Sequence, residues 1–163
     1  MMGKNEEILS LLERNARLSA ADIAVMLGLP AGEVEKVIDD LEQNKVILGY
    51  GALINWEKTA AAPVTALIEV RVTPQRDQGF DRIAQRIYRY PQVQSCYLMS
   101  GGFDLMVIIE DATLKEVAMF VSEKIAPLDS VVSTSTHFIL KKYKMNGIEF
   151  AVRDEDHREA VVL

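Results

Sequence analysis

Apolar residues recur at helical spacing three times in the N-terminal part of the chain. The stripes consist of Ile8, Leu11 and Leu12, then of Ala21, Ile23, Ala24 and Leu27, and then of Val34, Val37, Ile38 and Leu41. Ser19 is a favourable N-cap for the second helix, Gly28 ends that helix, and Pro30 stands at the start of the third. Residues 46–54 (VILGYGALI) are rich in β-forming residues and predict a strand or wing. Three short helices followed by a strand predict a winged helix-turn-helix over residues 1–54.

The pattern changes after residues 55–63 (NWEKTAAAP), which are the best candidate for a linker. Apolar residues alternate along 64–72 and predict a strand with one buried face. Further strands are expected at 93–99, 103–109 and 131–140, and two amphipathic helices are marked by Phe80, Ile83, Ile87 and Tyr90 and by Leu114, Val117, Ala118, Val121 and Ile125. The order βαββαβ over residues 64–144 predicts an α+β fold, a ferredoxin-like (ACT-like) sandwich whose halves are joined at Gly101-Gly102.

One face of such a sheet is left open, because both helices cover the other face. We expect a second subunit to cover the open face, which makes the protein a homodimer. The run 103–109 is apolar on both faces and is therefore expected at the centre of the sheet. Residues 145–163 are expected to form a C-terminal tail, with a candidate short strand at 148–150 and a solvated charge run, RDEDHREA, at 153–160.

Composition and charge narrow the class of protein. The chain of 163 residues is 49% hydrophobic and suits one ordinary domain or two small ones. Its apolar runs are far shorter than the ~20 residues that span a bilayer, and its N-terminus lacks the layout of a signal peptide. With one cysteine, Cys96, and no Cys/His cluster, no internal disulfide or zinc site is expected, and a reducing cytoplasm is the expected location. The net charge of −6 argues against attachment to nucleic acid mainly by bulk charge.

Three segments of the chain occur in a characteristic order. They are ILSLLERNARLSAADIAVMLGLPAGEVEKVIDDLEQNKVILGY, then VQSCYLMSGGFDLMVII with a G-x-x-D loop, and then VVSTSTHFILKKYK with a T-x-T motif. Together they resemble the Lrp/AsnC family of bacterial and archaeal transcription regulators over about residues 4–144. The G-x-x-D loop alone is a weak signal, whereas the three segments in this order are a strong one.

The resemblance implies a dimer built through the ferredoxin-like sheets, which associates further into tetramers or octamers. It also implies a small effector, an amino acid or a similar molecule, bound in the C-terminal domain near contacts between dimers. The effector would alter the assembly or the spacing of the DNA-binding heads. No cofactor, metal ion or catalytic residue is expected.

The third helix poses a problem for DNA binding, because family members commonly carry Arg or Lys on its exposed side. Residues 29–47 hold five acids and two lysines, and residues 1–50 hold nine acids against five basic residues. A glutamate can accept from cytosine, but five acids are too many to be base readers alone. The candidate DNA contacts are Glu33, Lys36 and Asp40 on this helix, with Arg14, Arg17, Ser19 and Lys45 placed to contact the phosphate backbone.

The segment SGGFD (100–104) is the candidate effector loop. One interpretation is a tight turn between two strands, with glycines supplying positive φ. A second adds a ligand: the Asp104 carboxylate accepts from an ammonium group, and the amides of Gly101 and Gly102 donate to a carboxylate. The candidate effector-binding residues are Ser100, Gly101, Gly102 and Asp104, with Thr134 and Thr136 as second-rank candidates because threonines are common sheet residues.

Other polar residues carry less specific signals. Arg82, Arg86 and Arg89 line one side of a predicted helix and are interpreted as a solvated face, with contact to wrapped DNA or a neighbouring dimer as the alternative. The two histidines, His137 and His157, are far apart in the sequence and suggest neither a metal site nor a catalytic one.

These residues are compatible with three functions. The first is an effector-sensing transcriptional regulator. The second is an effector-binding oligomer that has lost DNA binding and acts through protein partners, which the acidic third helix favours. The third is an enzyme resembling the sirohaem decarboxylases, which share the two-domain plan; two histidines and no nucleophile–base pair argue against it.

Overall fold

The structure is a computed structural model that describes residues 3–74 and 79–150. The chain divides into two compact units, residues 1–54 and residues 55–163, which we call the N-terminal and the C-terminal unit. No helix in the described ranges is long and apolar enough to cross a membrane.

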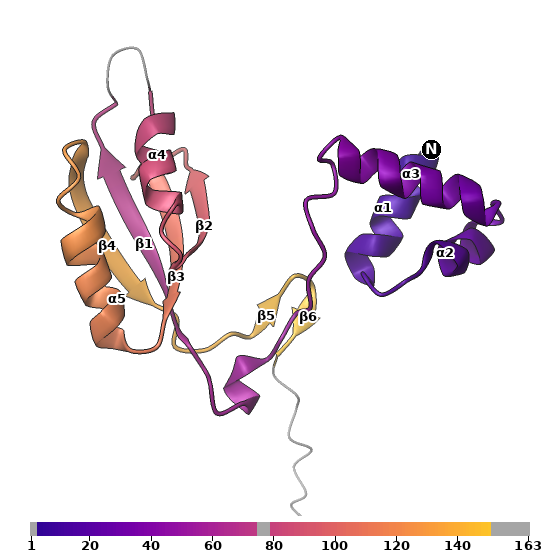
Figure 1. Ribbon diagram of the computed structural model, residues 1–163. Coiled ribbons are helices and arrows are strands. Elements are labelled where there is room, and N and C mark those ends of the chain that lie inside the picture. Colours follow the sequence, from indigo (N-terminus) through magenta and orange to yellow (C-terminus); the bar gives the residue numbers. More distant parts are fainter. Residues whose placement is uncertain (1–2, 75–78, 151–163) are drawn as a thin grey trace, which may run out of the picture. The chain divides into compact units, whose positions relative to one another are not determined.

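Three helices make up the described part of the N-terminal unit: α1 (Lys4–Arg14), α2 (Ala20–Leu27) and α3 (Ala31–Gln43) (Figure 1). All three contribute to a core of Ile8, Leu12, Ile23, Ala24 and Val34. This confirms the predicted helices and most of their buried residues. Ala21, expected on the inner side of α2, is exposed, while the preceding Ala20 packs against the core.

Local hydrogen bonds define both ends of α2. The Ser19 hydroxyl accepts from the Asp22 amide at 3.1 Å, and the Asp22 carboxylate accepts from the Ser19 amide at 2.9 Å, which forms a capping box. The hydrogen bond with the Ser19 side chain, and to a smaller extent the bond with the Ser19 backbone, hold the pKa of Asp22 below its ordinary value of 3.8. A depressed folded-state pKa stabilises the fold at neutral pH, and this contribution is lost as the pH falls below that value. Gly28, with φ of 67°, ends the helix in the left-handed conformation.

The strand predicted at residues 46–54 is absent, and this segment has no regular secondary structure. The amides of Val46 and Ile47 both donate to the Leu41 carbonyl at the end of α3. Ile47 packs against the helical core, whereas Val46 and Leu48 are exposed. A strand needs a neighbouring strand for its backbone groups, and the described part of the N-terminal unit contains none. The β-rich composition of this segment was therefore insufficient to make it a strand.

Four strands of the C-terminal unit form an antiparallel sheet in the order β2-β3-β1-β4. The elements are η1 (Trp56–Lys58), β1 (Val64–Val72), α4 (Asp81–Tyr88), β2 (Val93–Leu98), β3 (Leu105–Asp111), α5 (Leu114–Phe120), its π-helical continuation η2 (Val121–Ile125) and β4 (Val131–Phe138) (Figure 1). This order confirms the predicted βαββαβ sandwich and the central position of the strand that became β3.

Both helices of the sandwich pack on one face of the sheet. Beneath them, Ala66, Ile68 and Val70 of β1 are completely buried, in the alternation expected from the sequence. On the second helix, the apolar stripe differs from the prediction: Leu114 and Ala118 are exposed, and Phe120 joins the core instead, as does Leu128 in the turn that follows the helix. The π-helical turn adds a residue to the helical spacing, so the stripe does not follow the 3.6-residue period throughout.

A hairpin follows the sheet. β5 (Lys144–Met145) pairs with β6 (Ile148–Glu149). Asn146 and Gly147, with φ of 48° and 80°, both adopt the left-handed conformation that a two-residue type I′ turn requires. Part of the segment expected to be a tail is therefore folded, because the expected short strand has a partner that the sequence pattern did not indicate. The charge run at residues 153–160 lies outside the described residues.

Candidate functional site

The acids of α3 form two separate groups on the helix. Residues 35, 39 and 42 follow the i, i+4, i+7 spacing and share one side, whereas residues 33, 36, 40 and 43 share another. Glu35 and Asp39 line a cavity of about 240 Å³ together with Ile38 and Tyr50. The Tyr50 hydroxyl donates to the Glu42 carboxylate at 2.7 Å. Three of the five acids therefore lie on the side of α3 that faces Tyr50.

The pKa of Tyr50 records this arrangement. It is raised above its ordinary value of 10.0, first by the hydrogen bond to Glu42, then by burial, and then by the negative charges of Glu42 and Asp39. Ionised Tyr50 would lose its donated bond and stand next to carboxylates, so the neutral form is favoured.

The other side of α3 carries the predicted reading residues Glu33, Lys36 and Asp40, all exposed. Glu33 is not an isolated charge, because its carboxylate pairs with the ammonium group of Lys4 at the start of α1. Sequence analysis missed Lys4, which stands 29 residues from its partner. This side of α3 carries two acids, Glu33 and Asp40. Glu33 is paired with Lys4, whereas among the described residues Asp40 forms no ion pair.

The candidate backbone contacts lie around the loop between α1 and α2. Arg14 ends α1, and Arg17 is exposed in the loop, where its amide donates to the Asn15 side chain at 3.1 Å. The Ser19 hydroxyl is held by Asp22, whose carboxylate occupies the start of α2 and disfavours a phosphate there. Lys45 follows α3 with φ of 58° and is exposed.

The loop of Ser100, Gly101, Gly102 and Asp104 is tied to β1 by hydrogen bonds from the side chain and the backbone of Asp104. The Asp104 carboxylate accepts from the Val72 amide at 2.9 Å, and the Asp104 amide donates to the Val70 carbonyl at 3.1 Å. Gly101 has φ of 142°, which confirms the predicted positive φ for this glycine, whereas Gly102 does not have a positive φ. Asp104 therefore has a structural bond, and one carboxylate oxygen is used for it.

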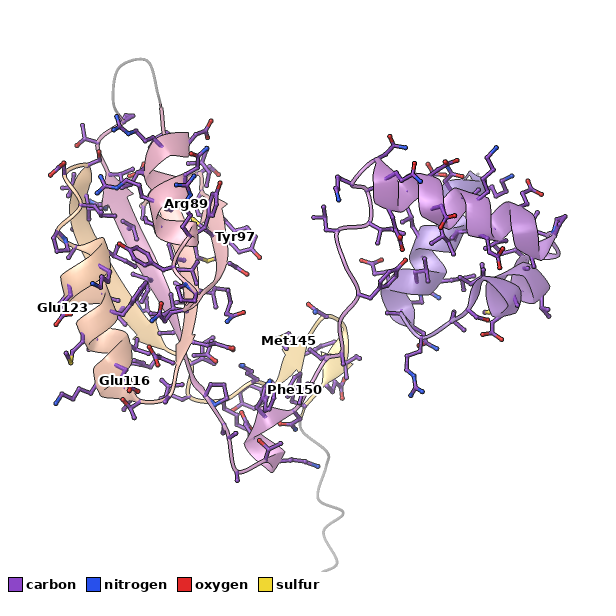
Figure 2. The ribbon with its side chains drawn as sticks, in the orientation of Figure 1. Arg89, Tyr97, Glu116, Glu123, Met145 and Phe150 are labelled. Carbon is purple, nitrogen blue, oxygen red and sulfur yellow. The ribbon has the colours of Figure 1, made fainter. Side chains whose placement is uncertain are left out.

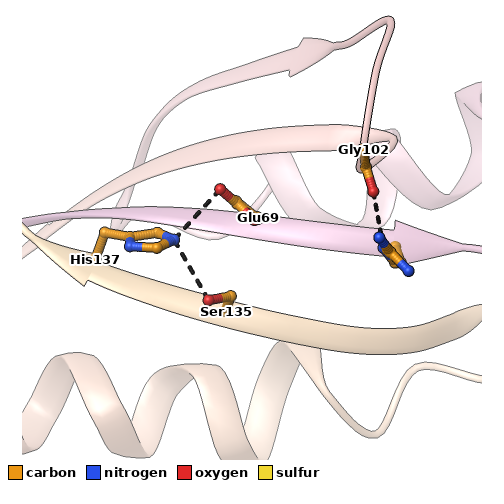
Figure 3. A network of polar contacts seen from close by, with 5 residues as sticks. Glu69, Gly102, Ser135 and His137 are labelled. Carbon is orange, nitrogen blue, oxygen red and sulfur yellow. Dashed lines mark hydrogen bonds and ion pairs between the residues drawn. The ribbon is translucent and has the colours of Figure 1, made fainter.

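Arg71 provides a further contact to the same loop that sequence analysis missed. Its Nε donates to the Gly102 carbonyl at 2.8 Å, a bond drawn in Figure 3. The guanidinium group places a positive charge beside the loop glycines. No spacing in the sequence indicated this pair, whose members are 31 residues apart.

Thr134 and Thr136 are not brought together with that loop. In the register of the sheet they lie opposite Val70 and Ile68 of β1, on the face that the helices cover. The loop reaches β1 from the side of β3, and the threonines reach it from the side of β4. One strand therefore separates them, at two strand spacings or roughly 10 Å.

The open face of the sheet carries partly exposed apolar side chains: Leu67 opposite Ile108, and Met106 opposite Tyr97, which is 50% exposed (Figure 2). A polar group lies on the same face, where His137 Nε2 is 3.3 Å from both the Glu69 carboxylate and the Ser135 hydroxyl (Figure 3). In a serine-hydrolase triad the acid and the serine hydrogen-bond to different nitrogens of the histidine ring. Here both contacts involve Nε2, so this group does not have the geometry of a triad. The described residues also contain no group of three or more metal-ligating side chains.

Comparison with known proteins identifies both units. Residues 4–47 match the family model for a winged helix-turn-helix DNA-binding domain, and residues 65–148 match that for the Lrp/AsnC ligand binding domain. The HTH-type transcriptional regulator YugG of Bacillus subtilis is 52% identical over 97% of this chain and 96% of its own length. The leucine-responsive regulatory protein of Haemophilus influenzae is 28% identical over 86% of this chain and 84% of its own.

A solved structure has the same fold. The transcriptional regulator NMB0573 of Neisseria meningitidis, in complex with L-Met, has a TM-score of 0.72 at 22% identity and covers 89% of this chain and 94% of its own.

Substitution of Glu42 by Gln is expected to lower the pKa of Tyr50 toward its ordinary value, because the largest cause of the increase is removed. The titration of Tyr50 can be followed by NMR with 13C-labelled tyrosine ring carbons. Glu33→Gln is the matched control, since it removes one acid from the opposite side of α3. An equal change of the Tyr50 pKa in both variants would contradict the division of the acids into two groups.

Proposed function

The chain belongs to the Lrp/AsnC family of transcriptional regulators, and we propose that its DNA binding or assembly responds to an amino acid or a similarly small effector. It is a DNA-binding regulator with a ligand-binding domain. The following assignments concern the residues that contact DNA in the N-terminal unit and those that bind the effector and form the dimer in the C-terminal unit. The observation that carries our assignment is the division of acids on α3, because it leaves one side of that helix with a cation at its centre.

For DNA, the proposed reading surface is the stripe of Glu33, Lys36 and Asp40. Lys36 is exposed, and the Lys4–Glu33 pair lowers the negative charge at one end of the stripe. Arg14 and Arg17, in and before the α1–α2 loop, are the proposed contacts to the phosphate backbone. Ser19 supports this surface by capping α2, and Lys45 adds a cation beyond α3. This arrangement favours DNA binding over the alternative of a head that has lost it.

For the effector, the proposed site is the loop of residues 100–104 beside Arg71. An amino acid has a carboxylate, which matches the loop amides and a guanidinium group, and an ammonium group, which matches Asp104. The relative whose solved structure is an L-Met complex supports an amino acid as the class of effector. Thr134 and Thr136 remain secondary candidates because β1 lies between them and the loop.

For assembly, we propose a homodimer formed through the open face of the sheet, with further association into a tetramer or octamer. Leu67, Met106, Ile108 and Tyr97 would otherwise expose apolar surface to water. A dimer would also increase DNA affinity, because two N-terminal units double the few cationic contacts that each provides in a chain of net charge −6.

Lys36→Ala is expected to change sequence preference, whereas Arg14→Ala and Arg17→Ala are expected to weaken binding to all DNA sequences alike. A base contact carries about 1–3 kcal/mol of discrimination, and a phosphate contact carries none. Selection of bound genomic fragments, followed by fluorescence anisotropy, measures both effects. Lys115→Ala on α5 is the charge-matched control and should change neither. Loss of affinity without any change of preference in Lys36→Ala would move this residue to the backbone contacts.

Neutralising the acids of the reading stripe is expected to increase non-specific DNA affinity. Asp40→Asn should have the larger effect and Glu33→Gln the smaller, since Glu33 is already paired with Lys4. Neutralising one exposed acid near the DNA backbone is expected to raise the affinity between about 1.5-fold and 5-fold. The control is Glu35→Gln with Asp39→Asn, which removes the same charge from the side that faces Tyr50. Equal gains from both pairs would show that only net charge matters.

Asp104→Asn is expected to abolish the response to the effector without unfolding the domain. The asparagine carbonyl can still accept from the Val72 amide, but the charge that holds an ammonium group is gone. Static light scattering, with each amino acid added in turn, measures assembly against the 18.2 kDa monomer. Asp111→Asn, at the other end of β3, is the control. A monomeric parent protein at micromolar concentration would refute the proposed dimer, and a full response in Asp104→Asn would refute the loop as the effector site.

A further inference from the structure

A polar cavity of about 240 Å³ lies between α4 and the turn that leads into β4. Among the described residues, its lining consists of Gly79, Arg82, Ile83, Arg86, Asp129 and Ser130. Ile83 belongs to the buried core, and the Ser130 carbonyl accepts from the Thr73 amide at 2.9 Å, just beyond the end of β1. The walls of the cavity are thus attached to the core and to the sheet, which gives its side chains a stable base.

Two arginines of this cavity stand one helical turn apart. Residues at i and i+4 share one side of a helix, and Arg82 and Arg86 both line the cavity from α4. Within the described ranges, no hydrogen bond or ion pair engages the Arg86 side chain, although Asp129 lines the same cavity. Arg82 and Ser130 have other interaction partners, so Arg86 is the first candidate to bind a ligand. A guanidinium fork matches two oxygens of a carboxylate or a phosphate.

Asp129 places a second condition on any ligand. An ionised carboxylate only accepts hydrogen bonds, so an anion without a donor group is repelled by it. An oxyanion that carries its own hydroxyl meets both conditions, because its oxygens accept from Arg86 and its O–H donates to Asp129. We propose that this cavity binds a small hydroxylated oxyanion, of which hydrogen phosphate, free or as the terminal group of a metabolite, is the simplest.

The chemistry of the cavity disfavours DNA as its ligand. Its volume of about 240 Å³ lies below the roughly 300 Å³ at which pockets for drug-sized ligands begin, which suits a compact oxyanion group. A DNA phosphodiester has no O–H group and would meet Asp129 with no donor to offer. The proposed oxyanion site therefore differs from a DNA-contacting surface, and it does not depend on the effector loop or on the proposed DNA contacts.

Isothermal titration calorimetry of the full chain, with inorganic phosphate and with sulfate at equal ionic strength near neutral pH, tests this site. Phosphate is expected to bind at least about tenfold more tightly than sulfate, since only phosphate can donate to Asp129. Arg86→Gln is expected to weaken phosphate binding about tenfold. Arg89→Gln is the matched control: it removes the same charge at the C-cap of the same helix (Figure 2), from a residue that does not line the cavity.

Asp129→Asn separates recognition from folding. This variant is expected to keep its melting temperature and to lose most of the preference for phosphate over sulfate, because an amide no longer repels an anion. Equal binding of the two anions by the parent, or binding of neither, would overturn the proposal. Equal losses of phosphate affinity in Arg86→Gln and Arg89→Gln would show that phosphate responds only to the net charge of the protein, which would also overturn the proposal. If Arg86→Gln lowered DNA affinity and left phosphate binding unchanged, the arginine would be a DNA contact instead.

Discussion

The central strand β1 is the constraint on which the C-terminal unit depends. It pairs with β3 on one side and β4 on the other, so its alternate residues must point to opposite faces. Ala66, Ile68 and Val70 are buried under the helices, which directs Leu67, Glu69 and Arg71 to the open face. A shift of one residue in register would exchange the two sets and expose the core. The polar groups of the open face, including Arg71 beside the loop glycines, are placed by the packing of the apolar ones.

The end of β1 also holds both candidate ligand sites. Val72 donates to Asp104 in the effector loop, and Thr73 donates to Ser130 in the wall of the oxyanion cavity. In the effector loop the charged side chains share in this support, because Asp104 accepts from Val72 and Arg71 donates to Gly102. In the oxyanion cavity the support comes from the backbone bond between Thr73 and Ser130, and among the described residues no hydrogen bond or ion pair engages the Arg86 side chain.

In the N-terminal unit, electrostatics and packing act together on α3. The apolar stripe buries Val34 against α1 and α2, and this sets the direction of every charge on the helix. Glu35, Asp39 and Glu42 fall on the side of Tyr50, and Lys36 falls on the side proposed to meet DNA. An acidic helix can therefore serve a DNA-binding domain when most of its acids are turned away from the polyanion and screened over a Debye length of about 8 Å.

The sequence alone determined the three N-terminal helices, the βαββαβ order of the C-terminal unit and the fold class, because burial imposes periods of 3.6 and 2 residues that are visible in the order of apolar positions. It also determined the ends of α2, because the Ser19 cap and the Gly28 stop each act on the helical turn next to them. The pairs Lys4–Glu33, Tyr50–Glu42 and Arg71–Gly102 were decided by tertiary structure. So were the absence of a strand at residues 46–54, the partner strand of the final hairpin and the meeting of Arg86 with Asp129 in one cavity. Periodicity states which face a side chain occupies, but a contact between distant residues depends on how those faces are brought together, and no local pattern encodes that.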